Sequence, residues 1–274
     1  MEPTPTIIES GHSGRGYWRD LYRYRELFYL LVWRDFLVRY RQTALGVAWA
    51  VIKPTATMAI LTLVFGKVAK LSSGDLPYPL LVYAGILPWQ MFSSAVSDSG
   101  SSLVNNVNLV SKVYFPRVLI PAATTAISVI DFVVCLALTA LLMLWYQVVP
   151  PVQVIFLPLF AGLIFMASLG TALWCSALIV LYRDFRFVLP FALQLGMFLS
   201  PVGFSSATVP EAWRWLYYLN PLASLIDGFR WCLFGGTHTL WLPGLAIACG
   251  VTAVVTYTGQ RFFRRAERVF ADII

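Results

Sequence analysis

The chain alternates long apolar segments with short polar connections. Since a helix rises about 1.5 Å per residue, roughly 20 apolar residues are needed to cross the hydrocarbon core of a bilayer. Only helices and closed barrels satisfy their backbone hydrogen bonds there, and barrel strands would read as alternations of about ten residues. The pattern therefore predicts an all-α membrane protein with six transmembrane helices, at about 43–66, 78–97, 118–146, 154–181, 187–204 and 240–257 within a domain over 43–260.

The segment before the first span has a different pattern. Residues 17–42 place apolar and aromatic side chains such as Leu21, Phe28 and Phe36 on one side of a helix and arginines opposite. This distribution is typical of an amphipathic helix that lies in the membrane interface. We therefore predict a cytoplasmic N-terminal region over 1–42 that contains such a helix. It would serve as a topological anchor alone, or also contact a lipid headgroup or a cytoplasmic partner.

Residues 211–236, before the last span, are aromatic and apolar but carry four charges and a central Asn220-Pro221 break. Each half is too short to cross a bilayer. With six spans the arginine-rich N-terminus and the basic tail at 261–274 both face the cytoplasm, as the positive-inside rule favours. We therefore predict a re-entrant or interfacial pair of short helices on the outer side, with Trp213, Trp215, Tyr217 and Tyr218 at headgroup level.

Composition agrees with a chain solvated by lipid. It is 59% hydrophobic and 12% charged, whereas soluble domains carry about 25% charged residues. The net charge of +7 comes mainly from Lys and Arg that flank the apolar runs. Membrane orientation and anionic headgroups explain this excess, so nucleic acid is not an expected partner. The four cysteines show no CxxC spacing and are read as packing residues.

Catalytic chemistry is not visible in the sequence. It contains no phosphate-binding loop, zinc-protease motif or nucleophile elbow, so no catalytic or metal site is predicted. Asp131 lies well inside the third span, where a carboxylate is a functional candidate. Because it has no ionisable partner at helical spacing, we favour a hydrogen bond to a neighbouring helix over proton coupling. Asp227 and Arg230 are three residues apart, so a local ion pair is their simplest interpretation.

Three blocks of sequence carry a family resemblance. They are RDFLVRYRQTALGVAWAVIKP at 34–54, YPLLVYAGILPWQMFSSAVSDSGSSLVNNVNLVSKVYFPR at 78–117 and LNPLASLIDGFRWCLFG at 219–235. In this order and spacing they resemble the ABC-2 type permeases of bacterial polysaccharide export, above all the O-antigen permeases, with capsule and teichoic acid permeases nearby. The resemblance covers almost the whole chain.

The resemblance implies a half-transporter of the bacterial inner membrane. Such a subunit forms a homodimer, docks two separate ATP-binding subunits that hold ATP and Mg, and exports a polyprenyl diphosphate-linked glycan. A coupling helix would follow the second span, and the turn after the fourth span would be a second ATPase contact. The implied coupling residues are Asn105, Asn106, Asn108, Lys112, Tyr114, Arg183, Asp184 and Arg186. The implied outer gate comprises Trp213, Trp215, Tyr217, Tyr218, Asp227 and Arg230.

A channel that slides a polysaccharide must bind it weakly and repeatedly, which aromatic faces and scattered polar groups can do. Our channel candidates are Trp49, Trp89, Phe92, Phe191, Gln194 and Phe198, for each of which lipid contact or core packing is the alternative. Arg34, Arg39 and Arg41 would be placed to bind the lipid diphosphate. Lipid orientation or ATPase docking would also explain these arginines.

Two other classes of function stay open at this point. One is an ABC-2 exporter of a different cargo, such as a drug or a lipid, which would have a cavity closed at both ends. The other is a membrane enzyme, active without a partner, or a proton-coupled carrier that depends on Asp131 and on the ion gradient.

Overall fold

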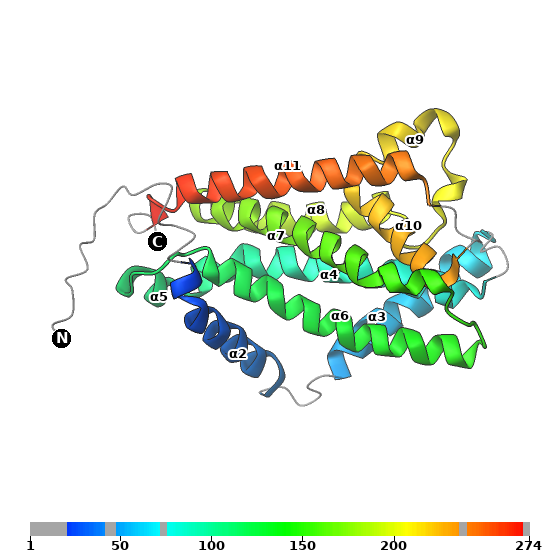
Figure 1. The fold of residues 1–274 in the computed structure, drawn as a ribbon, viewed down its shortest axis with the longest axis horizontal. Helices are drawn as coiled ribbons and strands as arrows, with labels where there is room; N and C mark the ends of the chain where they lie inside the picture. The colour runs from blue at the N-terminus through cyan, green and yellow to red at the C-terminus, as the bar shows by residue number, and fades with distance from the viewer. Residues whose placement is uncertain (1–20, 42–47, 72–75, 236–239, 271–274) are drawn as a thin grey trace.

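The computed structural model describes residues 21–41, 48–71, 76–235 and 240–270, and every regular element in these ranges is helical (Figure 1). The predicted start of the interface helix at residue 17 lies outside them. The helices are α2 (Arg25–Arg41), α3 (Ala48–Leu61), α4 (Tyr78–Asn105), α5 (Val107–Lys112), α6 (Leu119–Trp145), α7 (Leu157–Leu181), α8 (Phe185–Leu199), α9 (Glu211–Tyr217), α10 (Pro221–Phe234) and α11 (Leu242–Ala266). A π-helical turn (Thr62–Val68) extends α3, and 3-10 turns cover Val152–Phe156 and Ser206–Thr208.

Five helical segments in the described residues are long and apolar enough to cross a membrane. They are Ala48–Val68, Tyr78–Asn105, Leu119–Trp145, Val152–Leu181 and Leu242–Ala266. The fifth predicted span, at 187–204, is the shorter apolar helix α8 of 15 residues. Its helix stops because Ser200 precedes a proline and takes an extended conformation. The all-α membrane class is thus confirmed, and the six-span count stays a prediction.

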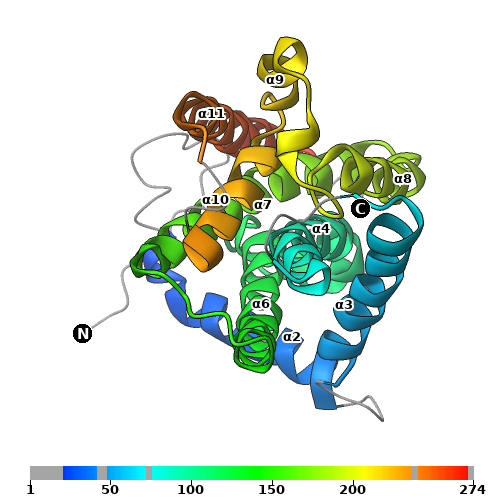
Figure 2. The same cartoon turned by 90° about the vertical axis from the view of Figure 1, so that its right-hand side faces the viewer.

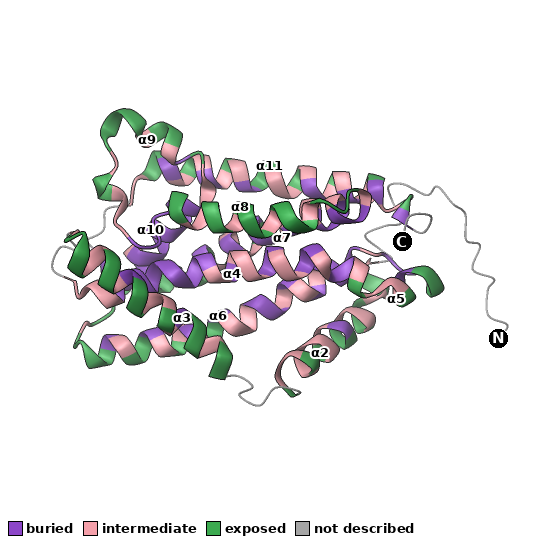
Figure 3. Ribbon diagram, turned by 180° about the vertical axis from the view of Figure 1, so that it is seen from behind, coloured by how far each residue is buried: buried purple, intermediate pink, exposed green. Residues whose placement is uncertain are grey.

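Helix α4 is the centre of the bundle. It packs against α3, α6, α7 and α10, and Figure 3 shows that most of its length is buried, whereas α3 and α8 are largely exposed. Residues 80–84 have no exposed surface at all. Such an all-round apolar helix needs partners on every side.

Two helices extend beyond the spans predicted for them. Helix α4 runs eight residues beyond the expected end at Ser97, to Asn105. Its serines bond to backbone carbonyls, Ser99 to that of Pro121 at 3.0 Å and Ser102 to that of Ser99 at 2.7 Å. These bonds satisfy the polar stretch within the helix. Helix α11 likewise continues to Ala266, into the region assigned to the basic tail.

Different short helices lie at the two ends of the bundle. At one end, α10 packs against α11 and the start of α4, and α9 projects from the same end of the bundle (Figures 1 and 2). The predicted break lies between them, where the Asn220 side chain caps α10 by accepting a bond from the Leu222 N–H at 3.1 Å. At the opposite end, α5 lies beside the end of α11, and α2 runs obliquely below α6 (Figure 1). We call these the α9 end and the α5 end.

Helices α7 and α11 approach closely through two glycines. A Cβ at Gly259 would lie 2.4 Å from the Gly170 carbonyl oxygen, and one at Gly170 would lie 2.7 Å from Thr256 Cα. We expect Gly259→Ala to destabilise the protein by about 1–3 kcal/mol, because the helices must separate. Gly250→Ala on the same helix meets nothing within 4 Å and should not. Equal thermal unfolding midpoints for both variants in detergent would contradict this contact.

Candidate transport cavity

A cavity of about 510 Å³ opens between α3, α4, α6 and α8 and reaches the end of α2. Its wall combines two indole rings, those of Trp49 and Trp89, with hydroxyl and amide groups. The polar groups from α4 are those of Gln90, Ser93, Ser94 and Ser97. These polar side chains therefore lie within the second predicted span, on a part of α4 that borders the cavity.

Interior prolines interrupt three helices around this cavity, namely Pro54 in α3, Pro88 in α4 and Pro190 in α8. A proline removes one helical hydrogen bond and leaves the carbonyl four residues earlier without its donor. For Pro54 that carbonyl belongs to Ala50, and it accepts a bond from the Cys135 thiol of α6 at 3.1 Å. At Pro54 the carbonyl that the proline frees thus finds its partner in a neighbouring helix.

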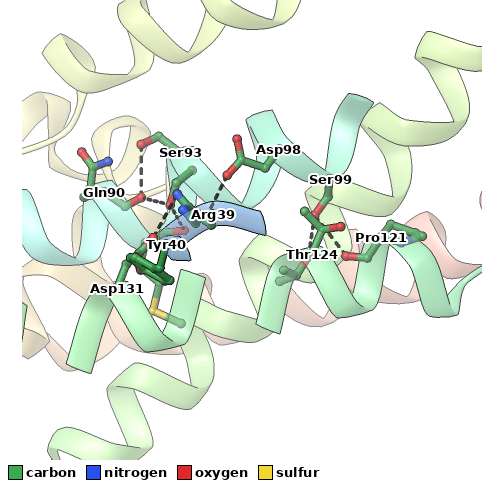
Figure 4. A network of polar contacts seen from close by, with 12 residues as sticks. Arg39, Tyr40, Gln90, Ser93, Asp98, Ser99, Pro121, Thr124 and Asp131 are labelled. Atoms are coloured by element: carbon green, nitrogen blue, oxygen red, sulfur yellow. Dashed lines mark hydrogen bonds and ion pairs between the residues drawn. The ribbon is translucent and has the colours of Figure 1, made fainter. Parts of the chain in front are cut away.

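An ion-pair cluster closes the cavity toward α2 (Figure 4). The Arg39 guanidinium lies 3.2 Å from the Asp98 carboxylate of α4 and 3.0 Å from the Asp131 carboxylate of α6. The Tyr40 hydroxyl also donates to Asp131. Asp131 has no ionisable partner at helical spacing, as expected, but it pairs with Arg39 of α2, about 90 residues earlier in the chain. The expected hydrogen bond to another helix is confirmed.

The predicted channel residues fall into three groups. Trp49, Trp89 and Gln194 line the cavity described above. Phe92 lines a second, mainly apolar cavity of about 730 Å³ between α4, α7, α8 and α11, which Trp89 also borders. Phe191 and Phe198 line neither cavity, and both are more than half exposed on the outer face of α8.

The three arginines proposed for a diphosphate do not act alike. Arg39 lines the cavity but is shared between two carboxylates. Arg34 pairs with its neighbour Asp35 at 2.6 Å, and Arg41 is exposed at the last residue of α2. Lys53 is the second cation in the cavity wall. Two cations therefore face two carboxylates there, and the wall carries no net formal charge.

The residues assigned to ATPase coupling gather at the α5 end (Figure 1). A short helix, α5, is present where a coupling helix was expected. Most of the assigned side chains are exposed. Asn106 is half-buried, and its side-chain amide donates to the Ser102 carbonyl at 2.8 Å. The exposed set is Asn105, Asn108, Lys112, Tyr114, Arg183, Asp184 and Arg186.

The residues assigned to an outer gate lie at the α9 end. The indoles of Trp213 and Trp215 are exposed, and the buried Tyr217 hydroxyl has no hydrogen-bond partner in the part of the chain that the structure describes. The predicted ion pair between Asp227 and Arg230 was wrong. The Asp227 carboxylate instead accepts a bond from the Tyr218 hydroxyl at 2.7 Å.

The fully buried Arg230 guanidinium donates to three backbone carbonyls. These belong to Leu81 at 3.2 Å, Phe204 at 2.9 Å and Val202 at 3.0 Å. Its role is therefore to hold α10 to the start of α4 and to the connection after α8. A guanidinium has five N–H donors, so three carbonyls can be satisfied at once.

Sequence reasoning missed Asp98 and Tyr40 as site residues. Asp98 comes directly after the predicted end of the second span at about residue 97. An available signal was that Gln90, Ser94, Ser97 and Asp98 recur at spacings of three and four residues, which places them on one helical face. Tyr40 gave no such signal, since its partner becomes apparent only once α2 packs on α6.

Comparison with known proteins identifies the class. A model of the ABC-2 type transporter family matches residues 26–234, which is more than half of the chain. The chain therefore belongs to the ABC-2 type transporter family. The first two blocks of the resemblance noted above, the ion-pair cluster and the α5 region all lie inside this match.

Individual relatives match the chain almost end to end. The O-antigen export system permease protein RfbA of Myxococcus xanthus is 28% identical over 258 residues, 93% of this chain and 98% of that protein. The protein of the same name from Klebsiella pneumoniae is 26% identical over 91% of this chain and 95% of its own. The polysialic acid transport protein KpsM of Escherichia coli is 25% identical over 85% and 91%. The similarity to permeases implies transport, not catalysis, by this chain.

The ion-pair cluster provides a test of how α2 is held. We expect Arg39→Ala to lower the thermal unfolding midpoint in detergent, by an amount equivalent to about 1–3 kcal/mol, because two carboxylates lose their cation. The same change in an Asp98→Asn, Asp131→Asn background should have little further effect. Arg34→Ala is the matched control, since an exposed pair within one helix contributes about 0–1 kcal/mol. Equal shifts in both backgrounds would show that the cluster does not hold α2.

Proposed function

We propose that this chain is the transmembrane subunit of an ATP-driven exporter of a polyprenyl diphosphate-linked polysaccharide, with O-antigen as the first candidate. The observation that carries this proposal is the match to O-antigen export permeases over more than nine-tenths of the chain. Capsular polysaccharide is the second candidate cargo, because the polysialic acid transport protein also matches most of the chain.

The chemistry of the cavity supports a glycan cargo. A sugar chain has apolar ring faces and many hydroxyl groups. Trp49 and Trp89 offer indole faces for the rings. The α4 serines, Gln90 and Gln194 offer donors and acceptors for the hydroxyls. The two cations of the wall are already balanced by two carboxylates, so a neutral polymer meets no strong fixed charge along this surface.

Arg39 and Lys53 are our candidates for the lipid diphosphate. Both line the cavity, and the two terminal nitrogens of Arg39, which contact one carboxylate each, could instead bind two oxygens of a phosphate. Arg34 and Arg41 lie on the same helix but away from the cavity wall, so lipid headgroups suit them better.

The other subunits and the orientation in the membrane are inferred from the family resemblance. We propose a homodimer in the bacterial inner membrane, both termini in the cytoplasm, with two ATP-binding subunits that hold ATP and Mg. The α5 end would then face the cytoplasm, and α5 with the 183–186 turn would contact those subunits. This orientation is supported by the positive-inside rule, since the arginines at 183, 186 and 261–268 cluster at that end.

Proton coupling through Asp131 is the weaker alternative. Its carboxylate is bound by Arg39 and Tyr40 of another helix. A carboxylate held in this way favours a structural function over cyclic protonation.

The proposal is tested by purifying the tagged chain from its own host in mild detergent. We expect an ATP-binding subunit in equal amount. Deletion of the gene should abolish surface polysaccharide and leave lipid-linked glycan inside the cell. Recovery of the chain without an ATP-binding subunit, under conditions in which a control ABC complex stays intact, would overturn the proposal.

Trp49 offers a substitution test in the cavity. We expect Trp49→Ala to reduce surface polysaccharide several-fold at equal protein abundance, because an aromatic contact contributes about 0.5–1.5 kcal/mol. Trp145→Ala removes an indole at the exposed end of α6, away from the cavity, and should leave export unchanged. Equal export by both variants would remove Trp49 from the path.

A further inference from the structure

Glu267 and Arg117 cap each other's helices at the α5 end. The Glu267 carboxylate accepts a bond from the Arg117 backbone N–H at 2.7 Å, in the turn where α6 begins. The Arg117 guanidinium in return donates to the Glu267 carbonyl at 2.7 Å, at the residue where α11 ends. A carboxylate at a helix N-terminus and a cation at a helix C-terminus both interact favourably with the helix dipole. These residues, 150 positions apart, thus join two helix ends in one contact.

This contact is partly buried, beside a dry aromatic core. Phe263, Phe270 and Phe115 are almost fully buried in one cluster, and the rings of Phe263 and Phe270 meet edge to face at 5.4 Å. Burial raises the pKa of the Glu267 carboxyl, while the Arg117 N–H and guanidinium favour its ionised form. The bonds between Glu267 and Arg117 are therefore shielded from competing water.

Helix α5 enters the same cluster through the side chains of Leu109 and Val110. Val110 is buried there, whereas Lys112 and Tyr114 on the following residues are exposed. Only four residues separate the end of α5 from Arg117. The Tyr114 carbonyl also lies 3.4 Å from the Tyr24 hydroxyl. The chain after α5 is thus short and held at both sides, so it has little slack to absorb a movement of α5.

From this geometry we infer that Glu267 is a positioning residue that transmits movement of α5 to α6 and α11. The inference rests on the proposed function, in which an ATP-binding subunit moves α5. The contact acts as a clamp: when α5 shifts, Arg117 shifts with it, and the two bonds to Glu267 force the start of α6 and the end of α11 to move together. Without the clamp, α5 would move while the two long helices stay in place.

The test compares export with ATP hydrolysis in the complete complex. Surface polysaccharide of the host is measured in a deletion strain that carries each variant, and the ATPase rate is measured on the purified complex in nanodiscs. We expect the complex with Glu267→Ala to keep its ATP-binding subunit and its ATPase activity. The amount of polysaccharide exported per ATP hydrolysed should fall about threefold or more, which is the range typical of residues that couple two sites. Glu267→Gln retains an acceptor for the Arg117 N–H and should restore most of the export.

Controls separate coupling from stability. Glu211→Ala removes a 90% exposed carboxylate at the α9 end and should leave the ratio unchanged. If Glu267→Ala does not accumulate, Arg117→Ala carries the test, because it removes the guanidinium but leaves the N–H bond to Glu267; its ratio should also fall. If these variants are less abundant in the membrane but export an unchanged amount of polysaccharide per ATP hydrolysed, the inference that Glu267 acts as a clamp is overturned. A wild-type chain that copurifies with no ATP-binding subunit overturns the proposed function instead.

Discussion

Within a bilayer, backbone that leaves a helix must find hydrogen-bond partners inside the protein, and the α9 end depends on this constraint. The connection after α8 is not helical, yet its carbonyls are satisfied: Arg230 binds those of Val202 and Phe204, and the Tyr78 hydroxyl binds that of Gly203 at 2.7 Å. A Cβ at Gly85 would lie 2.5 Å from this guanidinium, so the bare α4 backbone makes room for it. One buried cation thereby lets α8 stop short and α10 begin within the bundle.

The same constraint shapes the cavity. Interior prolines lie in three helices around it, and the Ala50 carbonyl that Pro54 leaves without its helical donor is bound by Cys135 of α6. The charges of the cavity wall are balanced in the same local way, with Arg39 between two carboxylates. The N-terminal helix α2 is therefore tied to the wall by an ion pair as well as by apolar contacts. A helix predicted to rest at the membrane interface is also part of the lining of the candidate path.

Sequence pattern predicted the helical membrane class and the position of most apolar helices, because the length of an apolar run reflects bilayer thickness. It placed the end of α4 too early, since the serine stretch reads as polar although Ser99 and Ser102 bond within the bundle. Hydropathy also could not reveal that Asp131 pairs with Arg39, or that Arg230 prefers backbone carbonyls to Asp227. These partners are set by tertiary packing across the chain, which periodicity does not encode.

Helix α6 connects the two regions to which function is assigned. It begins at the clamp between Arg117 and Glu267, and Asp131 lies 12 residues after its first residue, Leu119, about 18 Å along the axis. A helix of this length with close neighbours moves as a rigid body, because packed interiors resist continuous deformation. A displacement at its start would therefore reach Asp131 and, through Arg39, the end of α2. Movement of the α5 end would then be transmitted to the cavity wall through α6. The polar cluster in the wall would shift in response to movement that begins outside the membrane.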